Sequence, residues 1–219
     1  MGCDVLVTGG TGYIGGRLIP ALVARGHRVR ALARPASLKR VPRGATAVPG
    51  DALDAASVAA ALRPGDTLVQ LVGTPHPSPS KAAEFLRVDL ASALAAVEAA
   101  RRTGAAHVVY LSVAQPAPVM AAYRAARAQA ERALAEARLT ATVLRPWYVL
   151  GPGHYWPALL LPLYGAARLL PATRDGARRL GLVTLRQMVD ALVGAVEDPP
   201  PPGTLRVLDV PAIRAAAPR

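Results

Sequence analysis

The opening residues constrain the fold of this chain more than any other stretch. The apolar run at residues 4–8 (Asp-Val-Leu-Val-Thr) is followed at once by Gly9, Gly12 and Gly15, spaced G-x-x-G-x-x-G. The β-branched run is typical of a buried strand, and the amphipathic stretch 17–25 is typical of a helix. Glycine in such a connection permits a tight turn, close approach of the backbone to a ligand, or close packing of helix on strand.

This strand–turn–helix unit favours a nucleotide site over a purely structural turn. The start of the helix offers unpaired N–H groups and a partial positive charge, which suit a pyrophosphate. A second strand, expected at residues 29–33, completes the context that the motif needs. The residues expected to bind the cofactor in this turn are Gly9, Thr11, Gly12, Tyr13, Ile14 and Gly15.

Length and composition favour an α/β fold. The 219 residues are enough to bury a full core, and the low aromatic content of 4% with many small aliphatic side chains suits helices packed on a sheet. We expect a doubly wound parallel sheet (Rossmann) with a short C-terminal helical lid. Residues 1–219 are expected to form a single dinucleotide-binding domain, with a reduced substrate cap within residues 150–219.

The single cysteine and the absence of a recognisable signal peptide favour the cytoplasm, because no disulfide framework can form. The apolar stretch 156–170 contains two prolines and is shorter than the ~20 residues that span a bilayer, so no transmembrane segment is expected. An amphipathic surface, a substrate lid or ordinary core is the expectation for this stretch. No metal site is expected, and a homo-oligomer is compatible with the sequence.

The formal net charge of +12 comes almost entirely from arginine. These arginines are spread along the chain without a dense basic run that alternates with aromatic residues, so we expect no nucleic-acid partner. Solvated arginine is the favoured interpretation, although a basic surface attracts anions in general.

The end of the second strand indicates which dinucleotide binds. An acidic residue there binds the 2′-hydroxyl of NAD, whereas an arginine accommodates the 2′-phosphate of NADP. No Asp or Glu lies between Asp4 and Asp51, and Arg34 follows the strand. We therefore favour NADP(H), with NAD(H) as the alternative. The other interpretation of Arg34 is a loop charge that faces water.

Further strands are expected at residues 45–48, 67–72, 106–112, 140–144 and 204–210. Helices are expected at 81–102, around Tyr123 and from about 183 to 197. Asp54, Ser80 and Thr184 precede helical runs and are predicted to cap them. His76 lies where the carboxyl ends of the strands gather, so it either contacts substrate or is a solvated loop histidine.

Four blocks then occur in order along the chain. They are the glycine turn, a strand ending in Ser112, a helix with Tyr-x-x-x-Arg at 123–127 followed by Glu131, and Leu-Arg-Pro…Gly-Pro-Gly at 144–153. Together they resemble atypical members of the short-chain dehydrogenase/reductase superfamily, of the NmrA-like and complex I subunit-like kind, up to about Glu197. The resemblance adds five residues to the expected cofactor site: Asp51 at the adenine, with Ala52, Val72, Gly73 and Pro146.

The resemblance also implies a proton-transfer set of Tyr123, Arg127 and Ser112. In the superfamily, a lysine four residues after the tyrosine holds the nicotinamide ribose and lowers the pKa of the tyrosine. Here Arg127 occupies the lysine position, and Ala114 occupies the position of the usual active serine. Because guanidinium and ammonium are not interchangeable, the alternative is a partly buried helix tyrosine beside a solvated arginine.

The expected function is that of an NADP-dependent oxidoreductase acting on a small apolar carbonyl or quinone-like substrate. Aromatic residues gather after the sixth strand, which suggests a flat or apolar ligand or, alternatively, the packing of a short lid: Trp147, Tyr148, His154, Tyr155 and Trp156. The rival interpretation is a non-catalytic NADP(H)-binding sensor or an assembly or accessory subunit. A third is binding of anionic surfaces through arginine.

Overall fold

The computed structural model describes residues 2–155, 159, 162, 175, 176 and 178–216. Most of the apolar stretch 156–170, for which a substrate lid was one of the expectations, lies outside these described residues, Trp156 included.

The core of the fold is one parallel sheet. Its strands run in the order β3-β2-β1-β4-β5-β6-β9, and every neighbouring pair is parallel. The chain order reverses between β1 and β4, which is the point where open α/β sheets bind ligands. The predicted doubly wound sheet is confirmed. The strands are β1 (Asp4–Thr8), β2 (Arg28–Ala33), β3 (Thr46–Pro49), β4 (Thr67–Gln70), β5 (His107–Leu111), β6 (Ala141–Leu144) and β9 (Leu205–Leu208).

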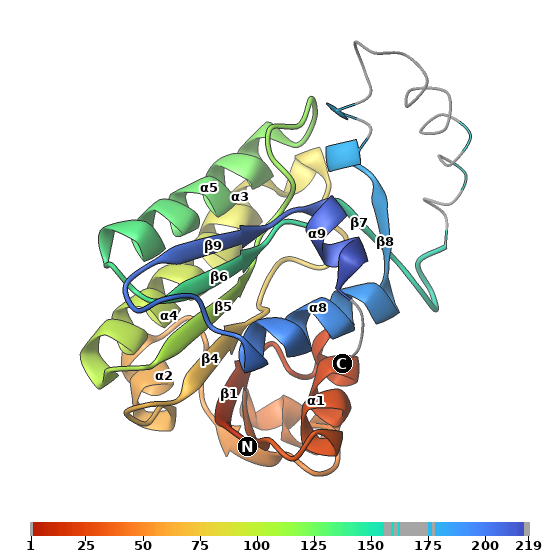
Figure 1. Ribbon diagram of the computed structural model, residues 1–219. Helices are drawn as coiled ribbons and strands as arrows, with labels where there is room; N and C mark the ends of the chain where they lie inside the picture. Colours follow the sequence, from red (N-terminus) through yellow and green to blue (C-terminus); the bar gives the residue numbers. More distant parts are fainter. Residues whose placement is uncertain (1, 156–158, 160–161, 163–174, 177, 217–219) are drawn as a thin grey trace.

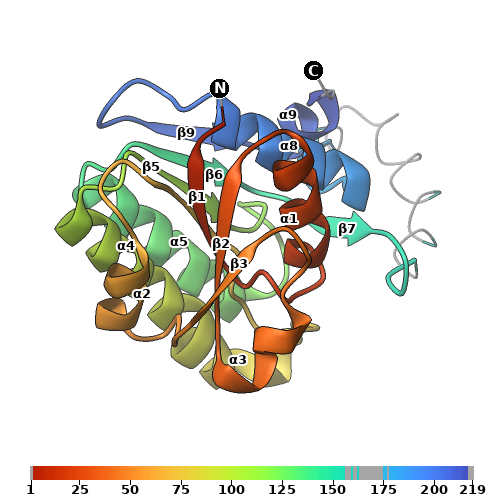
Figure 2. The ribbon, with the colours of Figure 1, turned by 90° about the horizontal axis from the view of Figure 1, so that it is seen from below.

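Helices cover both faces of this sheet (Figures 1 and 2). One face carries α1 (Gly15–Ala24), α8 (Leu185–Glu197) and α9 (Val210–Ala215). The other carries α2 (Ala55–Ala61), α4 (Ala91–Thr103) and α5 (Ala121–Glu136). Alternate residues of β1 serve the two layers, because Val5 and Val7 belong to the first core cluster and Leu6 to the second. The sequence of a strand that is buried on both sides is therefore a continuous run of apolar residues.

Two of the three predicted helix caps are confirmed. The Asp54 carboxylate accepts hydrogen bonds from the backbone N–H groups of Ala56 and Ser57 at the start of α2. Thr184 and Gln187 form a reciprocal capping box at the start of α8. The prediction for Ser80 is wrong: its hydroxyl lies 2.8 Å from the Ser78 hydroxyl, within a short 3₁₀ turn that opens with a proline.

The helix expected at residues 81–102 is interrupted. It begins with η2 (Pro79–Lys81) and α3 (Ala82–Glu84), passes through a π-helical turn, η3 (Phe85–Leu90), and continues as α4. π-turns inside helices occur frequently at functional sites. The chain end also differs from expectation, since the last strand stops at Leu208 and α9 follows, capped by Asp209 through the backbone N–H of Ala212. After β6, a small parallel pair joins β7 (Tyr148–Leu150) to β8 (Leu182–Thr184).

Candidate functional site

A cavity of about 410 Å³ opens at the carboxyl ends of β1, β2 and β4. The glycine turn contributes Gly9, Thr11 and Gly12 to its lining, and Arg34 lies at the end of β2. The loops after β3 and β4 complete it with Asp51, Ala52, Val72 and Gly73. The structure thus brings eight of the predicted cofactor residues to one cleft. Its volume is within the range typical of small-molecule sites.

The glycine turn requires glycine at two places for different reasons. Gly9 has a positive φ of 74°, and a Cβ there would lie 2.8 Å from the carbonyl carbon of Leu71. A Cβ on Gly15 would lie 2.4 Å from the carbonyl oxygen of Gly9. The first glycine therefore makes the turn, and the second lets α1 begin directly against it. Tyr13, Ile14 and Gly15 are in the turn but do not line the cavity.

Arg34 and Asp51 line the cleft from the ends of the neighbouring strands β2 and β3. Arg34 is exposed and, within the described residues, its guanidinium has no hydrogen-bond or ion-pair partner. Asp51 is also exposed, and its carboxylate accepts a hydrogen bond from the backbone N–H of Leu53 at 2.9 Å. The cleft therefore has a free positive charge at the position where the sequence lacks an acidic residue.

Tyr123 and Arg127 share one face of α5, as their spacing predicts. The Tyr123 ring packs against Phe85 with ring centroids 4.9 Å apart, and the Arg127 guanidinium carbon lies 5.1 Å from the centre of the Tyr123 ring. Arg127 is buried, so the alternative of a solvated charge is wrong. Its guanidinium binds the Asp89 carboxylate at 2.5 Å and the carbonyl oxygen of Leu111 at 2.7 Å.

The charge on Arg127 is stable in this setting. Burial alone lowers the pKa of Arg127, but the neighbouring Tyr110, Tyr123 and Asp89 raise its pKa above the ordinary arginine value. The Tyr110 hydroxyl accepts a further hydrogen bond from Arg127 at 3.3 Å. Burial raises the pKa of Tyr110. Arg127 is therefore a permanent cation with most of its donors engaged by the protein.

Ser112 belongs to a second buried network. Its hydroxyl donates to the Glu131 carboxylate, which also accepts from the Gln115 amide at 3.0 Å and from the Arg145 Nε at 3.1 Å. Pro146 lies beside this network, and its carbonyl oxygen accepts from the backbone N–H of Ala114 at 2.9 Å. Neither Ser112 nor Pro146 lines the cleft at the glycine turn.

The aromatic residues expected near the substrate form two groups. Trp147 and Tyr148 pack edge to face, with ring centroids 5.5 Å apart. Separately, His154 lies between Tyr13 and His76, at 4.6 and 5.0 Å between ring centroids. Burial raises the pKa of Tyr13, and its hydroxyl has no hydrogen-bond partner among the described residues. His76 thus meets the glycine turn through His154, while Tyr155 is exposed.

Asp89 is a buried charged residue beside the cleft that the sequence analysis did not single out. It is fully buried on the π-turn, beside Val88, which lines the cleft. The available signal was an acidic residue within an apolar helical run, between Val88 and Leu90. Charged residues are almost never fully buried unless they are paired.

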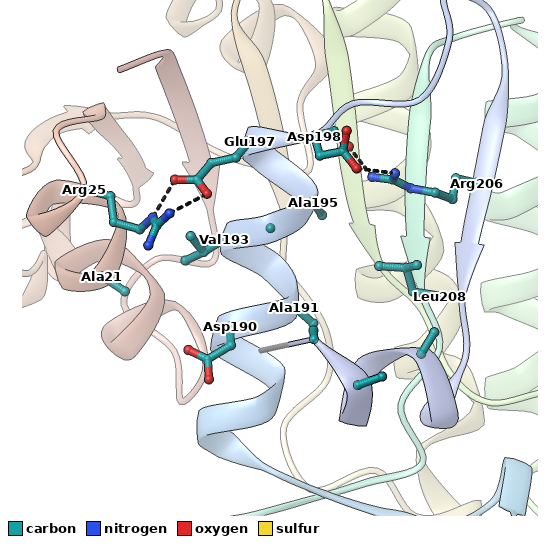
Figure 3. Close-up of a pocket in the computed structure, with 14 residues that line it drawn as sticks. Ala21, Arg25, Asp190, Ala191, Val193, Ala195, Glu197, Asp198, Arg206 and Leu208 are labelled. Atoms are coloured by element: carbon teal, nitrogen blue, oxygen red, sulfur yellow. Dashed lines mark hydrogen bonds and ion pairs between the residues drawn. The ribbon is translucent and has the colours of Figure 1, made fainter. Parts of the chain in front are cut away.

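A second cavity of about 420 Å³ lies between α1, α8, β9 and α9 (Figure 3). None of the predicted site residues lines it. The Arg25–Glu197 ion pair spans α1 and α8, and the Arg206–Asp198 ion pair ties β9 to the end of α8. Across the described residues there is no cluster of metal-ligating side chains, and none of the helices found there is long and apolar enough to cross a membrane.

Comparison with known proteins identifies a family for most of this chain. Residues 9–152 match the NAD(P)H-binding family. A "3-diazoavenalumate denitrifying reductase" of Streptomyces sp is 34% identical over 220 residues, covering 88% of this chain and 72% of that protein. A "Ceramide reductase" of Caulobacter vibrioides (strain NA1000 / CB15N) is 28% identical, covering 80% of this chain and 55% of that protein. The solved structure "MoeE5 in complex with UDP-glucuronic acid and NAD" superposes with a TM-score of 0.69 at 24% identity, covering 94% of this chain and 75% of that one. The structural likeness shows the fold alone.

Proposed function

The chain belongs to the NAD(P)H-binding family, of atypical short-chain dehydrogenase/reductase type, and we propose that it is an NADP(H)-dependent reductase of a small apolar carbonyl or quinone-like compound. We also propose that residues 1–219 act as a single domain, with a reduced substrate cap from residue 150 onward. The two sequence relatives named above, from Streptomyces sp and Caulobacter vibrioides, are reductases by name, which supports reduction as the reaction class.

One observation carries the choice of cofactor: the cleft offers Arg34 as a free cation and no acidic residue at the end of β2. The 2′-phosphate of NADP needs a hydrogen-bond donor at this position, whereas the 2′-hydroxyl of NAD needs a hydrogen-bond acceptor. In this proposal the glycine turn seats the pyrophosphate, Arg34 binds the 2′-phosphate and Asp51 lies at the adenine. NAD(H) remains the alternative cofactor.

For the chemical step we propose Tyr123 as the proton donor. NADPH, when bound, would supply the hydride that the carbonyl carbon of the substrate accepts. The Tyr123 phenol gives its proton to the carbonyl oxygen, so that the carbonyl double bond becomes a C–H and an O–H bond. Arg127 and Ser112 are the other two members of the proton-transfer set predicted with Tyr123. The aromatic side chains of Trp147 and Tyr148 suit a flat substrate.

The rival function is a non-catalytic NADP(H) sensor or accessory subunit. The engagement of Ser112 by Glu131 and of Arg127 by Asp89 favours it, because neither side chain presents a free donor to a substrate. The two functions differ in turnover and share cofactor binding.

NADPH oxidation with a panel of carbonyl and quinone compounds separates the two functions. We expect turnover with at least one compound, and we expect Tyr123→Phe to lower kcat by 10²-fold or more while the Kd for NADPH stays unchanged. Tight NADPH binding without turnover of any compound would favour the sensor. Turnover that survives in Tyr123→Phe would remove Tyr123 from the reaction.

The preference for NADP(H) is tested at Arg34. Arg34→Gln should raise the Kd for NADPH about tenfold or more and leave the Kd for NADH nearly unchanged, because only the 2′-phosphate loses a charged partner. Arg43→Gln is the matched control, since Arg43 is also an exposed loop arginine but does not line the cleft. Equal effects on both dinucleotides would contradict the assignment.

A further inference from the structure

A buried ion pair lies directly behind one wall of the cofactor cleft. Gly73 and Val88 line the cleft, and Asp89 and Arg127 lie beneath them, both buried. Three separate segments meet there: the loop after β4, the π-turn η3 and helix α5. The α5 helix packs on η3.

The Asp89 carboxylate uses both oxygens. One accepts from the backbone N–H and the hydroxyl of Thr74, at 2.9 and 2.5 Å. The other accepts from the Arg127 guanidinium at 2.5 Å. Arg127 in turn donates to the Leu111 carbonyl oxygen at the end of β5. The pair therefore joins the loop after β4 to the end of the neighbouring strand, without contact with solvent.

Gly73 shows how closely the pair approaches the wall. A Cβ on Gly73 would lie 2.4 Å from the Arg127 Nη2 and 3.0 Å from the Asp89 Oδ1. The backbone at Gly73 therefore has the cleft on one side and the ion pair in direct contact on the other. A displacement of Arg127 or Asp89 would remove the support of this backbone.

We infer that the Asp89–Arg127 pair is a positioning device that fixes the Gly73–Thr74 turn as a wall of the cofactor cleft. Arg127 acts on the cofactor through this backbone and does not contact it, unlike the role expected from the lysine position. This inference rests on the proposed function in one respect, namely that the dinucleotide lies in the cleft. Arg127 is thus a positioning residue.

The choice of arginine follows from the number and direction of its partners. Asp89, the Leu111 carbonyl and the Tyr110 hydroxyl surround the guanidinium, and the Tyr123 ring lies 5.1 Å from its carbon. A planar guanidinium has five N–H donors in fixed directions and also packs on aromatic faces. An ammonium group is a compact point charge and cannot serve these partners at once.

Hydrogen exchange of the protein without cofactor tests the device first. In the wild type, the Thr74 amide is protected by Asp89. We expect Asp89→Asn and Arg127→Lys to speed exchange of residues 71–76 by tenfold or more, and Thr74→Val, which removes only the hydroxyl contact, to have a smaller effect. Glu98→Gln is the control, because it removes a solvent-exposed ion pair with Arg101 on α4. Unchanged exchange in Asp89→Asn would overturn the inference.

Calorimetric titration with NADPH then tests the consequence for the site. Asp89→Asn and Arg127→Lys should each raise the Kd for NADPH about tenfold, and the double variant should be no weaker than either single one, because both break the same support. Additive effects, or tighter binding by Arg127→Lys, would show direct contact with the ribose and overturn the inference. If the wild type binds no NADPH, the proposed function fails and the exchange measurement alone decides the inference.

Discussion

Two regions of the molecule use the same kind of ion pair in opposite environments. Beside the cofactor cleft, the Arg127 and Asp89 side chains are 4% and 0% exposed. Along the second cavity, the Arg25 and Glu197 side chains are 34% and 28% exposed (Figure 3). Water and salt screen the second pair, whereas the first has no solvent to replace a lost partner.

This difference in exposure indicates where a charged side chain can be removed with little loss of stability. Removing one member of a buried pair leaves an uncompensated charge, while removing one member of an exposed pair leaves a solvated one. We therefore expect the surroundings of Asp89 and Arg127 to be sensitive to single substitutions of polar side chains. The α1–α8 side should tolerate them.

Arg127→Met should destabilise the protein by about 3–5 kcal/mol, because the Asp89 carboxylate is left buried without its cation. Urea unfolding followed by circular dichroism measures this loss. The double variant Asp89→Leu/Arg127→Met should lose less stability than the sum of its single variants, since no buried charge remains. Additive losses would mean that the two side chains do not act as a pair.

His107 should make the stability depend on pH. Burial and, to a smaller extent, the charge of Arg206 lower the pKa of His107 from 6.5 to about 4, with Asp198 opposing the change. The unfolded chain takes up a proton near pH 6.5 but the folded chain does so only near 4, so the stabilising contribution is complete above pH 6.5 and decreases as the pH falls toward 4. The loss should reach about 3 kcal/mol at most.

The measurement is the free energy of unfolding at several pH values between 4 and 7. His107→Gln should flatten the profile, because glutamine does not titrate. The control His76→Gln changes an exposed histidine and should leave the slope as in the wild type. A His107→Gln profile as steep as that of the wild type would assign the pH dependence to other groups.

Asp54→Ala should lower the free energy of unfolding by about 1 kcal/mol. This effect lies between those expected for Arg127→Met and for Arg25→Ala. The carboxylate caps α2 through the backbone N–H groups of Ala56 and Ser57, which are partly served by water when the cap is lost. Thermal unfolding measures the change, and Asp54→Asn should restore most of it. A loss of stability equal to that of Arg127→Met would contradict the expectation that breaking the buried ion pair has the larger effect.

Arg25→Ala should change the melting temperature by no more than about 2 °C, because its pair with Glu197 is screened. Raising the salt concentration should reduce even this change. The Kd for NADPH should be the same as in the wild type, since Arg25 follows the C-terminal end of α1, whereas the cleft is lined by the glycine turn before α1. A clear loss of NADPH affinity would mean that the two regions are coupled.

Local signals made much of the fold predictable from the sequence. The glycine turn, the apolar strand runs and the caps at Asp54 and Thr184 depend on residues close together in the chain, and the structure confirms them. The α9 helix had a local signal as well, Asp209 followed by Val210 and a proline. That stretch was instead predicted as the end of a strand.

Contacts between distant residues account for what the sequence did not predict. Asp89 and Arg127 are far apart in the chain, and nothing near either one indicates its partner. The pairing of β7 with β8 likewise joins segments more than thirty residues apart. Eight of the residues predicted to bind the cofactor line one cleft, and their role there stays a prediction.

Isothermal titration calorimetry of the wild-type chain with NADPH tests the central claim most directly. The cleft at the glycine turn, with Arg34 free at its edge, predicts saturable heat with a Kd in the micromolar range for NADPH and weaker binding of NADH. An absence of binding heat with either dinucleotide at millimolar concentration would contradict the account.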